Sequence, residues 1–209
     1  MSGVCIHGMN INNLRYADDT ALIANDPKKL QDIVNKVKDE SSKAGLDMNV
    51  KKTKTMVISR HKEENNPVIT VDGVPLEMVD IFKYLGTLIV ENAKTEVEIE
   101  ARTKLAKAQF SAMSKTFTSK RLKIKTKLRI LKCYIFSIFT YGSEAWTLSK
   151  VLEQKIEALE MYCFRWIGNI SWKDKVSNEN VLKKINTKRS LLKDIQKKKT
   201  SVLRPHQTQ

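Results

Sequence analysis

The spacing of the apolar residues changes near residue 92, and this change limits the folds that the chain can adopt. Before it, short β-branched runs such as residues 55–58 alternate with turn residues, a pattern typical of strands. After it, apolar residues recur every three or four positions over long segments, which indicates amphipathic helices. The sequence therefore predicts an α+β fold with two domains: residues 1–92 mix strands and helices, and residues 93–209 are all-helical.

Turn and capping residues place the elements of the first half. Asp26-Pro27 predicts the start of a helix, because an N-cap Asp accepts unpaired backbone N–H groups and Pro has no N–H to leave unpaired. Gly45 predicts a left-handed end to that helix. Asp72-Gly73 predicts a hairpin, since both residues tolerate positive φ. Residues 81–90 are expected to continue as extended chain.

Three helices are predicted in the second half, at residues 96–113, at residues 124–139, and from the capping residue Ser149 to Gly168. The inward stripe of the first helix is expected to be Val97, Ala101, Leu105, Ala108 and Ala112. The inward stripe of the third is expected to be Leu152, Ile156, Leu159, Cys163 and Trp166. The Lys-rich stretch at residues 183–209 is expected to fray.

The positive charge of the chain is confined to its second half. The net charge is +15, but residues 1–92 hold 12 Lys/Arg and 13 Asp/Glu, whereas residues 93–209 hold 26 Lys/Arg and 10 Asp/Glu. From Arg102 to Lys132 there are 11 basic residues and no acidic one. Such an asymmetry favours a surface that faces a polyanion, nucleic acid above all. A solvated basic surface and non-specific attraction to a membrane are the alternatives.

Other features exclude whole classes of protein. No apolar run approaches the roughly 18 residues of a membrane span, and the first residues lack the pattern of a signal peptide. Cys5, Cys133 and Cys163 are odd in number and far apart. They are expected to be packed, reduced thiols of an intracellular protein rather than disulfides or zinc ligands.

Asp18 and Asp19 are the residues best suited to metal chemistry. Short runs at residues 14–16 and 20–24 flank them, which predicts a hairpin bent at the two acids. Phosphoryl transfer to a nucleotide uses two divalent ions about 3.5–4 Å apart, and Mg²⁺ prefers oxygen ligands. The alternative is an ordinary turn, because Asp also favours turns through its own side-chain hydrogen bonds.

Several further motifs occur around this pair, in a fixed order. They are Asn13 to Leu22 with Tyr16-Ala17-Asp18-Asp19 at its centre, Gly45 to Lys54 with the pattern Gly-Leu-x-x-Asn-x-x-Lys-Thr, Phe82 to Gly86, Tyr141 to Trp146, and Arg165 to Asn178. Together they resemble the reverse transcriptases of LINE-type (non-LTR) retrotransposons. The resemblance covers residues 8 to about 186. It implies a partial polymerase palm at residues 1–92 and a basic helical thumb and C-terminal region at residues 93–209.

The resemblance implies catalytic roles for residues of the first half. Asp18 and Asp19 would be metal ligands for Mg²⁺, which acts as two ions in the complete enzyme. Lys52 would donate a proton to the leaving pyrophosphate, with a solvated lysine as the alternative, and Asn49 would brace its turn. The substrates would be deoxynucleoside triphosphates.

The resemblance also implies contacts with an RNA template and a DNA primer. Tyr84, Leu85 and Gly86 would form the primer grip, packing under the primer end; ordinary strand packing is the alternative. The residues expected to face the template and primer phosphates are Arg102, Lys104, Lys107, Lys120, Arg121, Lys123, Lys125, Lys127 and Arg129. Trp146, Trp166 and Trp172 could stack on bases, but core or capping aromatics are the favoured interpretation.

The sequence departs from the family pattern upstream of the Asp pair. The pattern needs another metal-binding Asp and the fingers there, yet only 15 residues precede Tyr16 and none is acidic. The chain alone is therefore expected not to polymerise, the missing half being lost or encoded elsewhere. The alternative is a non-catalytic remnant that binds nucleic acid through its basic helices, and a third interpretation is a decayed fragment that folds poorly. LINE-type resemblance favours the nucleus as the site of action.

Overall fold

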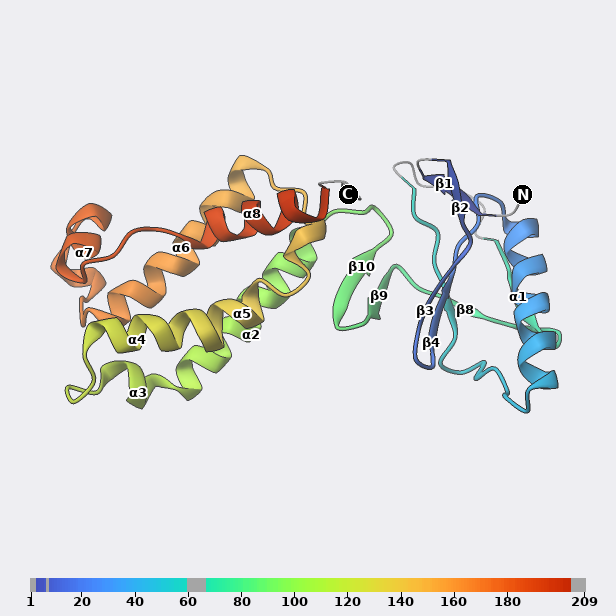
Figure 1. Cartoon of the computed structure of the whole chain (residues 1–209), viewed down its shortest axis with the longest axis horizontal. Helices are drawn as coiled ribbons and strands as arrows, with labels where there is room; N and C mark the ends of the chain where they lie inside the picture. The colour runs from blue at the N-terminus through green and yellow to red at the C-terminus, as the bar shows by residue number, and fades with distance from the viewer. Residues whose placement is uncertain (1–2, 7, 60–66, 204–209) are drawn as a thin grey trace, which may run out of the picture. The chain divides into compact units, whose positions relative to one another are not determined.

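The computed structural model describes residues 3–6, 8–59 and 67–203. The fold is α+β, as the sequence predicts: two-stranded sheets come first and helices follow (Figure 1). The chain divides into two compact units, one of Met1–Phe82 with Val90–Ala93 and one of Lys83–Ile89 with Lys94–Gln209. A short segment from the first half, residues 83–89, thus groups with the helices.

The strands of the described chain pair two by two. The antiparallel pairs are β1 (Val4–Ile6) with β2 (Met9–Ile11), β3 (Asn13–Tyr16) with β4 (Asp19–Leu22), and β6 (Thr70–Val71) with β7 (Val74–Pro75). The parallel pair is β5 (Lys54–Thr55) with β8 (Glu77–Met78). The remaining pair is β9 (Ile81–Tyr84) with β10 (Thr87–Val90).

The local predictions for the first unit are largely confirmed. Helix α1 (Pro27–Lys43) begins after Asp26, whose carboxylate accepts the Lys28 N–H at 2.7 Å. Gly45 has φ +75°, the left-handed conformation expected at the helix end. Asp72-Gly73 forms the turn between β6 and β7, with φ +51° and +76°. A small core of Val34, Ile69, Val71 and Leu76 joins the helix to this hairpin.

Two predictions for the first unit are wrong. The strand expected at residues 55–58 is reduced to β5, whose parallel pairing with β8 extends over two residues only. Residues 81–90 are a hairpin and not one extended segment. Leu85 and Gly86 both have positive φ, +47° and +81°, and two such residues in succession reverse the chain.

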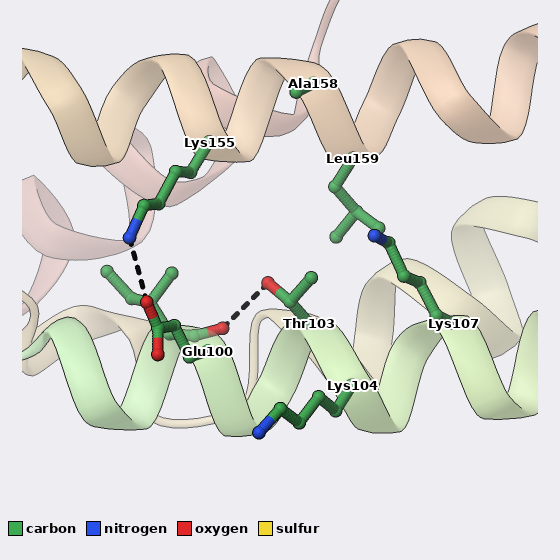
Figure 2. Close-up of a pocket in the computed structure, with 8 residues that line it drawn as sticks. Glu100, Thr103, Lys104, Lys107, Lys155, Ala158 and Leu159 are labelled. Carbon is green, nitrogen blue, oxygen red and sulfur yellow. Dashed lines mark hydrogen bonds and ion pairs between the residues drawn. The ribbon is translucent and has the colours of Figure 1, made fainter.

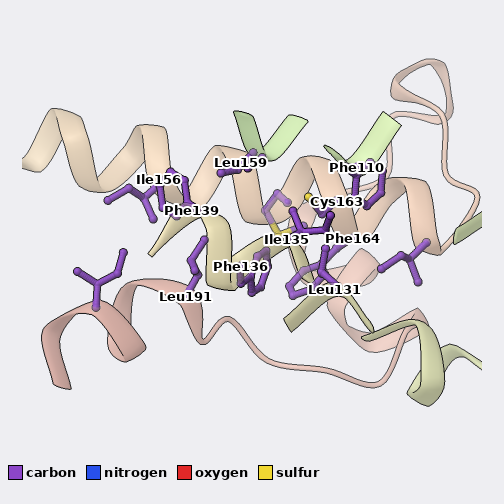
Figure 3. Close-up of a cluster of buried hydrophobic side chains, with 14 of the residues drawn as sticks. Phe110, Leu131, Ile135, Phe136, Phe139, Ile156, Leu159, Cys163, Phe164 and Leu191 are labelled. Carbon is purple, nitrogen blue, oxygen red and sulfur yellow. The ribbon is translucent and has the colours of Figure 1, made fainter. Parts of the chain in front are cut away.

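From Lys94 onward, the described elements of the second unit are helical, and this part is called the helical unit below. They are α2 (Glu96–Ala112), α3 (Ser114–Thr118), α4 (Ile124–Ile130), η1 (Leu131–Phe136), α5 (Ser137–Phe139), η2 (Ser143–Ala145), α6 (Lys150–Ile167), η3 (Trp172–Asp174), α7 (Asn178–Lys184) and α8 (Leu191–Leu203). α4, η1 and α5 follow one another without a break, so the predicted helix at residues 124–139 is present, with a π-helical middle. α2 packs against α5, η1 and α6, while α8 packs against α6 and η2. Figure 3 shows the core that these helices share, with Phe110, Leu131, Ile135, Phe139 and Phe164 among its fully buried side chains.

The set of inward-facing residues was predicted correctly for four of five positions in α6 and wrongly for α2. Leu152, Ile156, Leu159 and Cys163 are buried, although Trp166 remains 44% exposed. In α2, by contrast, Val97 and Leu105 are exposed. The buried residues there are Glu98, Ile99, Arg102, Ala106 and Phe110. The polar members of this stripe are the reason that apolar spacing did not identify it.

The Lys-rich C-terminal region is ordered as far as it is described, contrary to the expectation of fraying. Leu191 and Ile195 of α8 are buried in the core. Lys198 Nζ donates to the Thr140 carbonyl and hydroxyl oxygens at 3.1 and 3.0 Å, and Lys199 Nζ donates to the Trp146 carbonyl at 3.2 Å. These ammonium groups bind backbone oxygens of the helical unit, so they help to hold α8 in place. Residues 204–209 lie outside the described residues.

The three cysteines form no disulfide: Cys163 is buried, whereas Cys5 and Cys133 are exposed. The expectation of packed thiols therefore holds for one of them. No helix within the described ranges is long and apolar enough to cross a bilayer.

A buried carboxylate caps the start of α8. Glu160 on α6 is buried, and its Oε1 accepts the N–H groups of Ser190 and Leu191 at 2.9 and 3.1 Å. Burial raises the pKa of the Glu160 carboxyl above its ordinary 4.5, and the two backbone hydrogen bonds partly oppose the rise. Ionised Glu160 is thus less favourable in the folded protein than in the unfolded chain.

Replacing Glu160 by glutamine should therefore change how stability depends on pH. In the wild type, the contribution of the Glu160 carboxyl to the free energy of unfolding is greatest below pH 4.5. It falls as the pH rises through the raised pKa of the folded state. The amide of the variant keeps an oxygen acceptor but does not titrate. The difference in unfolding free energy, Glu160→Gln minus wild type, should rise over this interval and then level off. Urea denaturation followed by tryptophan fluorescence from pH 4 to pH 8 measures it; a difference that is constant or falls with pH would contradict the prediction.

Candidate functional site

The two candidate metal ligands lie on a tight hairpin turn. Tyr16 pairs with Asp19, which leaves Ala17 and Asp18 as the turn between β3 and β4. The predicted hairpin is present, with its bend one residue earlier than the two acids suggested. Both carboxylates are exposed. Ala17 has φ +49°, a conformation that costs a non-glycine residue about 1 kcal/mol. This conformation is part of the tight turn that carries Asp18.

The two carboxylates offer fewer ligands than a two-metal magnesium site would require. Carboxylate oxygens are suitable ligands for Mg²⁺, but two octahedral ions require more ligands than two adjacent side chains supply. No group of three or more His, Cys, Asp or Glu residues that could hold a metal ion occurs within the described ranges. Asp18 and Asp19 therefore carry the kind of ligand that Mg²⁺ prefers, but two side chains are too few to complete its coordination.

Lys52 lies in a turn that Asn49 organises. The Asn49 side chain accepts the Lys52 N–H at 3.1 Å, and its carbonyl accepts the Thr53 N–H at 2.9 Å. The bracing role expected of Asn49 is thus seen in its hydrogen bonds. Lys52 itself is exposed. Within the described part of the chain, no ion pair joins Lys52 to Asp18 or Asp19.

The predicted primer-grip residues form the tip of the β9–β10 hairpin, and this tip is bound to the helices. Tyr141 Oη donates to the Leu85 carbonyl at 2.8 Å. Arg102 donates from a terminal guanidinium nitrogen to the Gly86 carbonyl at 2.5 Å. Glu98 accepts the Leu88 N–H at 2.8 Å. Residues 85–88 are therefore fixed by side chains of the helical unit.

Arg102 was predicted to face phosphates, but the structure places it inside the protein. It is 8% exposed and pairs with Glu98, itself 3% exposed, at 2.6 Å. Its guanidinium also lies over the Tyr141 ring, 4.7 Å from the centroid. Sequence reasoning did not single out Glu98. The i, i+4 spacing of an acid and an arginine beside Ile99 and Ala106 was the pattern that could have identified the pair.

Most of the other basic candidates are on the surface. Seven of the nine predicted residues are exposed: Lys104, Lys107, Lys120, Arg121, Lys123, Lys125 and Arg129. Lys127 is buried. Apart from Arg102 and Lys127, the basic candidates are thus exposed cations from a stretch of sequence, residues 102–132, that includes no acid. A surface that carries such cations attracts polyanions without reading their sequence.

A shallow groove of about 390 Å³ runs between α2 and α6 beside this surface. In Figure 2, Lys155 of α6 reaches across to Glu100 of α2, with which it pairs at 2.8 Å, while Lys104 points away from the groove. Lys107 Nζ lies 5.3 Å from the centre of the Tyr162 ring. The groove is therefore bordered by cations and partly closed by an ion pair.

The tryptophans differ in their surroundings. Trp146 is buried against Phe139, with ring centroids 5.4 Å apart, and is a core residue as the favoured interpretation held. Trp166 meets Phe110 edge-on at 6.2 Å and is partly exposed. Trp172 is 81% exposed.

Comparison with known proteins agrees with the motifs. Residues 3–89 match the model of the family described as reverse transcriptase (RNA-dependent DNA polymerase). This range includes Asp18, Asp19, Lys52 and the β9–β10 tip. The chain is also 32% identical over 156 residues to an uncharacterized transposon-derived protein of Caenorhabditis elegans. That alignment covers 72% of this chain and 54% of the relative, so the chain spans about half the length of the curated relative it matches. No solved structure matches.

Removing the guanidinium of Arg102 should strongly destabilise the helical unit. Arg102→Met leaves the Glu98 carboxylate buried without its partner, which typically costs about 3–5 kcal/mol. Urea denaturation followed by fluorescence measures this loss, because all three tryptophans lie in the helical unit. Lys155→Met is the matched control: it breaks an ion pair to the same helix whose partners are exposed, so the midpoint should stay near that of wild type. Equal effects of the two substitutions would contradict the prediction.

Proposed function

We propose that the chain is a fragment of the reverse transcriptase of a LINE-type retrotransposon, an RNA-directed DNA polymerase. The observation that carries the proposal is the family match over residues 3–89, within which Asp18 and Asp19 sit exposed on a hairpin turn. The similarity to a transposon-derived protein supports the same origin. In this proposal residues 1–92 are part of the palm, and residues 93–209 are the thumb with the C-terminal region.

In the complete protein, Asp18 and Asp19 would hold Mg²⁺. The bound ions would supply charge neutralisation for nucleotidyl transfer from a deoxynucleoside triphosphate. The exposure of both carboxylates and the short turn that carries them suit ligands that receive an ion from solvent. Lys52, also exposed and held by the Asn49 turn, is assigned as the proton donor to pyrophosphate.

The exposed basic residues of the helical unit are assigned to the backbones of an RNA template and a DNA primer. The assignment rests on seven exposed cations in a stretch without acids. Contacts of this kind hold a duplex irrespective of its sequence. An intracellular site of action follows from the proposal, with the nucleus favoured by the LINE-type resemblance.

A second candidate function is nucleic-acid binding without chemistry. Two adjacent carboxylates are too few for a two-metal site, and no third candidate ligand joins them within the described ranges. The basic surface needs no metal to bind a duplex. We therefore propose that the chain alone binds template and primer and does not extend the primer.

Binding of an RNA–DNA hybrid should weaken steeply with salt. Each phosphate contact releases counterions, so the double substitution Lys123→Gln/Lys125→Gln should lower the slope of log affinity against log salt by about one to two units. Fluorescence anisotropy at a series of KCl concentrations measures the slope. The control, Lys28→Gln/Lys29→Gln, removes the same charge at exposed positions of α1 and should leave the slope almost unchanged. Equal slopes for both variants would refute the assigned surface.

Primer extension on an RNA template with Mg²⁺ tests the catalytic part of the proposal. We expect no extension by the chain alone and no change in hybrid binding with Asp18→Asn, because Asp18 is not among the residues assigned to the phosphates of the hybrid. An unrelated active reverse transcriptase serves as the positive control. Extension that Asp18→Asn abolishes would show that a complete metal site forms, and it would overturn the proposed inactivity while supporting the family assignment.

A further inference from the structure

We infer that Glu98, Arg102 and Tyr141 form a tip clamp that positions the β9–β10 tip for the primer end. The inference rests on the proposed function, because it takes the primer-grip role of Tyr84, Leu85 and Gly86 as its premise. The three clamp residues are positioning residues: they act through the backbone of the tip.

The clamp residues form hydrogen bonds with backbone groups of the tip. The carbonyls of Leu85 and Gly86, the two turn residues, accept hydrogen bonds from Tyr141 Oη and the Arg102 guanidinium. The Leu88 N–H donates to Glu98. Backbone groups within four successive residues are therefore bonded to side chains of α2 and of the turn after α5. Because these contacts use backbone atoms, they fix the path of the tip whichever side chains it carries.

The clamp residues are themselves fixed. Glu98 and Arg102 are buried and joined at 2.6 Å, and the Tyr141 ring lies under the guanidinium. Gly142, next to Tyr141, has φ +71°, and a Cβ there would lie 2.8 Å from Thr87 Oγ1. Only glycine allows the backbone after α5 to come so close to β10. The tip is thus held by polar contacts and by a backbone packed against it.

The tip needs such support because its turn is strained. Leu85 has φ +47°, which an L-residue with a side chain adopts at a cost. The hydrogen bonds to its carbonyl and to that of Gly86 favour this conformation over a relaxed one. Leu85 stays 37% exposed, and Gly86 is exposed as well. The tip therefore presents a fixed surface to solvent while its carbonyls face the clamp.

The clamp attaches the tip to the same helix, α2, that carries the exposed cations Lys104 and Lys107. Glu98 and Arg102 occupy the buried side of α2, whereas Lys104 and Lys107 of the same helix are exposed. The distance from the tip to these cations is therefore set by a single helix. A duplex whose backbone rests on α2 would meet the tip at a defined position. This geometry favours a hybrid with a recessed DNA 3′ end over a blunt hybrid of the same sequence.

The test compares the two hybrids with the full chain. Wild type should bind the recessed hybrid more tightly in fluorescence anisotropy. Tyr141→Phe removes one hydrogen bond to the tip and keeps the ring under Arg102, so it should reduce the preference about fivefold and leave blunt-hybrid affinity unchanged. Tyr134→Phe, an exposed tyrosine of η1, is the matched control and should retain the preference. Tyr141 is half exposed, so the variant should keep its fold, which circular dichroism checks.

Hydrogen exchange over residues 83–89 gives a readout that requires no nucleic acid. Exchange should be faster in Tyr141→Phe than in wild type and unchanged in Tyr134→Phe. Unchanged exchange in Tyr141→Phe, or a preference that survives the substitution, overturns the clamp. Equal binding of the two hybrids by wild type overturns the positioning role and leaves the proposed nucleic-acid binding intact. Binding of neither hybrid overturns the proposed function and this inference with it.

Discussion

The buried ion pair between Glu98 and Arg102 joins helix α2 of the helical unit to the β9–β10 tip. Burying two charges costs several kcal/mol per ion before their attraction is counted, and an apolar pair of the same size would fill the space on α2 at less cost. The pair is fully engaged, however: the carboxylate binds the arginine and the Leu88 N–H, and the guanidinium binds the carboxylate and the Gly86 carbonyl. Apolar side chains could not bind these backbone groups. The charged pair therefore stabilises the fold less than an apolar pair would, but it fixes the backbone of the hairpin tip.

The elements that could be predicted from the sequence depend on neighbouring residues, whereas those that could not depend on remote contacts such as this ion pair. The start of α1 at Asp26-Pro27 and the turn at Asp72-Gly73 were predictable because each depends on a few neighbouring residues. The buried stripe of α2 was not predictable, because it is set by packing against α5, η1 and α6 and by the hydrogen bond that Glu98 accepts from the Leu88 N–H, and these partners are remote in sequence or belong to another element. The apolar residues Val97 and Leu105 suggested one buried face of α2, whereas the buried face in the structure is the one that carries Glu98 and Arg102. The Leu85-Gly86 turn was missed for a related reason, because leucine does not favour positive φ and requires outside support.

The candidate site divides in the same way. Asp18, Asp19 and Lys52 could be selected from the sequence because their motifs are short and contiguous, and the turns that carry them are formed locally. A metal site also requires ligands from separate elements, and contiguous motifs say nothing of how such elements meet. The role of Tyr141 belongs to this second kind. It lies 56 residues after Leu85 in the chain, and its hydroxyl acts on a backbone oxygen, which no pattern of residue types reveals.

The basic charge of the second half also has two physical roles that composition cannot separate. Lys198 and Lys199 bind backbone oxygens that hold α8, Arg165 binds the Val176 carbonyl, and Arg102 is buried in the clamp. These cations still contribute to the long-range field that attracts a polyanion. They are already bonded within the protein, however, so they cannot release counterions from phosphates in the way that exposed lysines do. Under the proposed function, the net charge of the helical unit would govern how fast a nucleic acid approaches. The smaller set of exposed cations between Lys104 and Arg129 would govern how strongly salt opposes its binding.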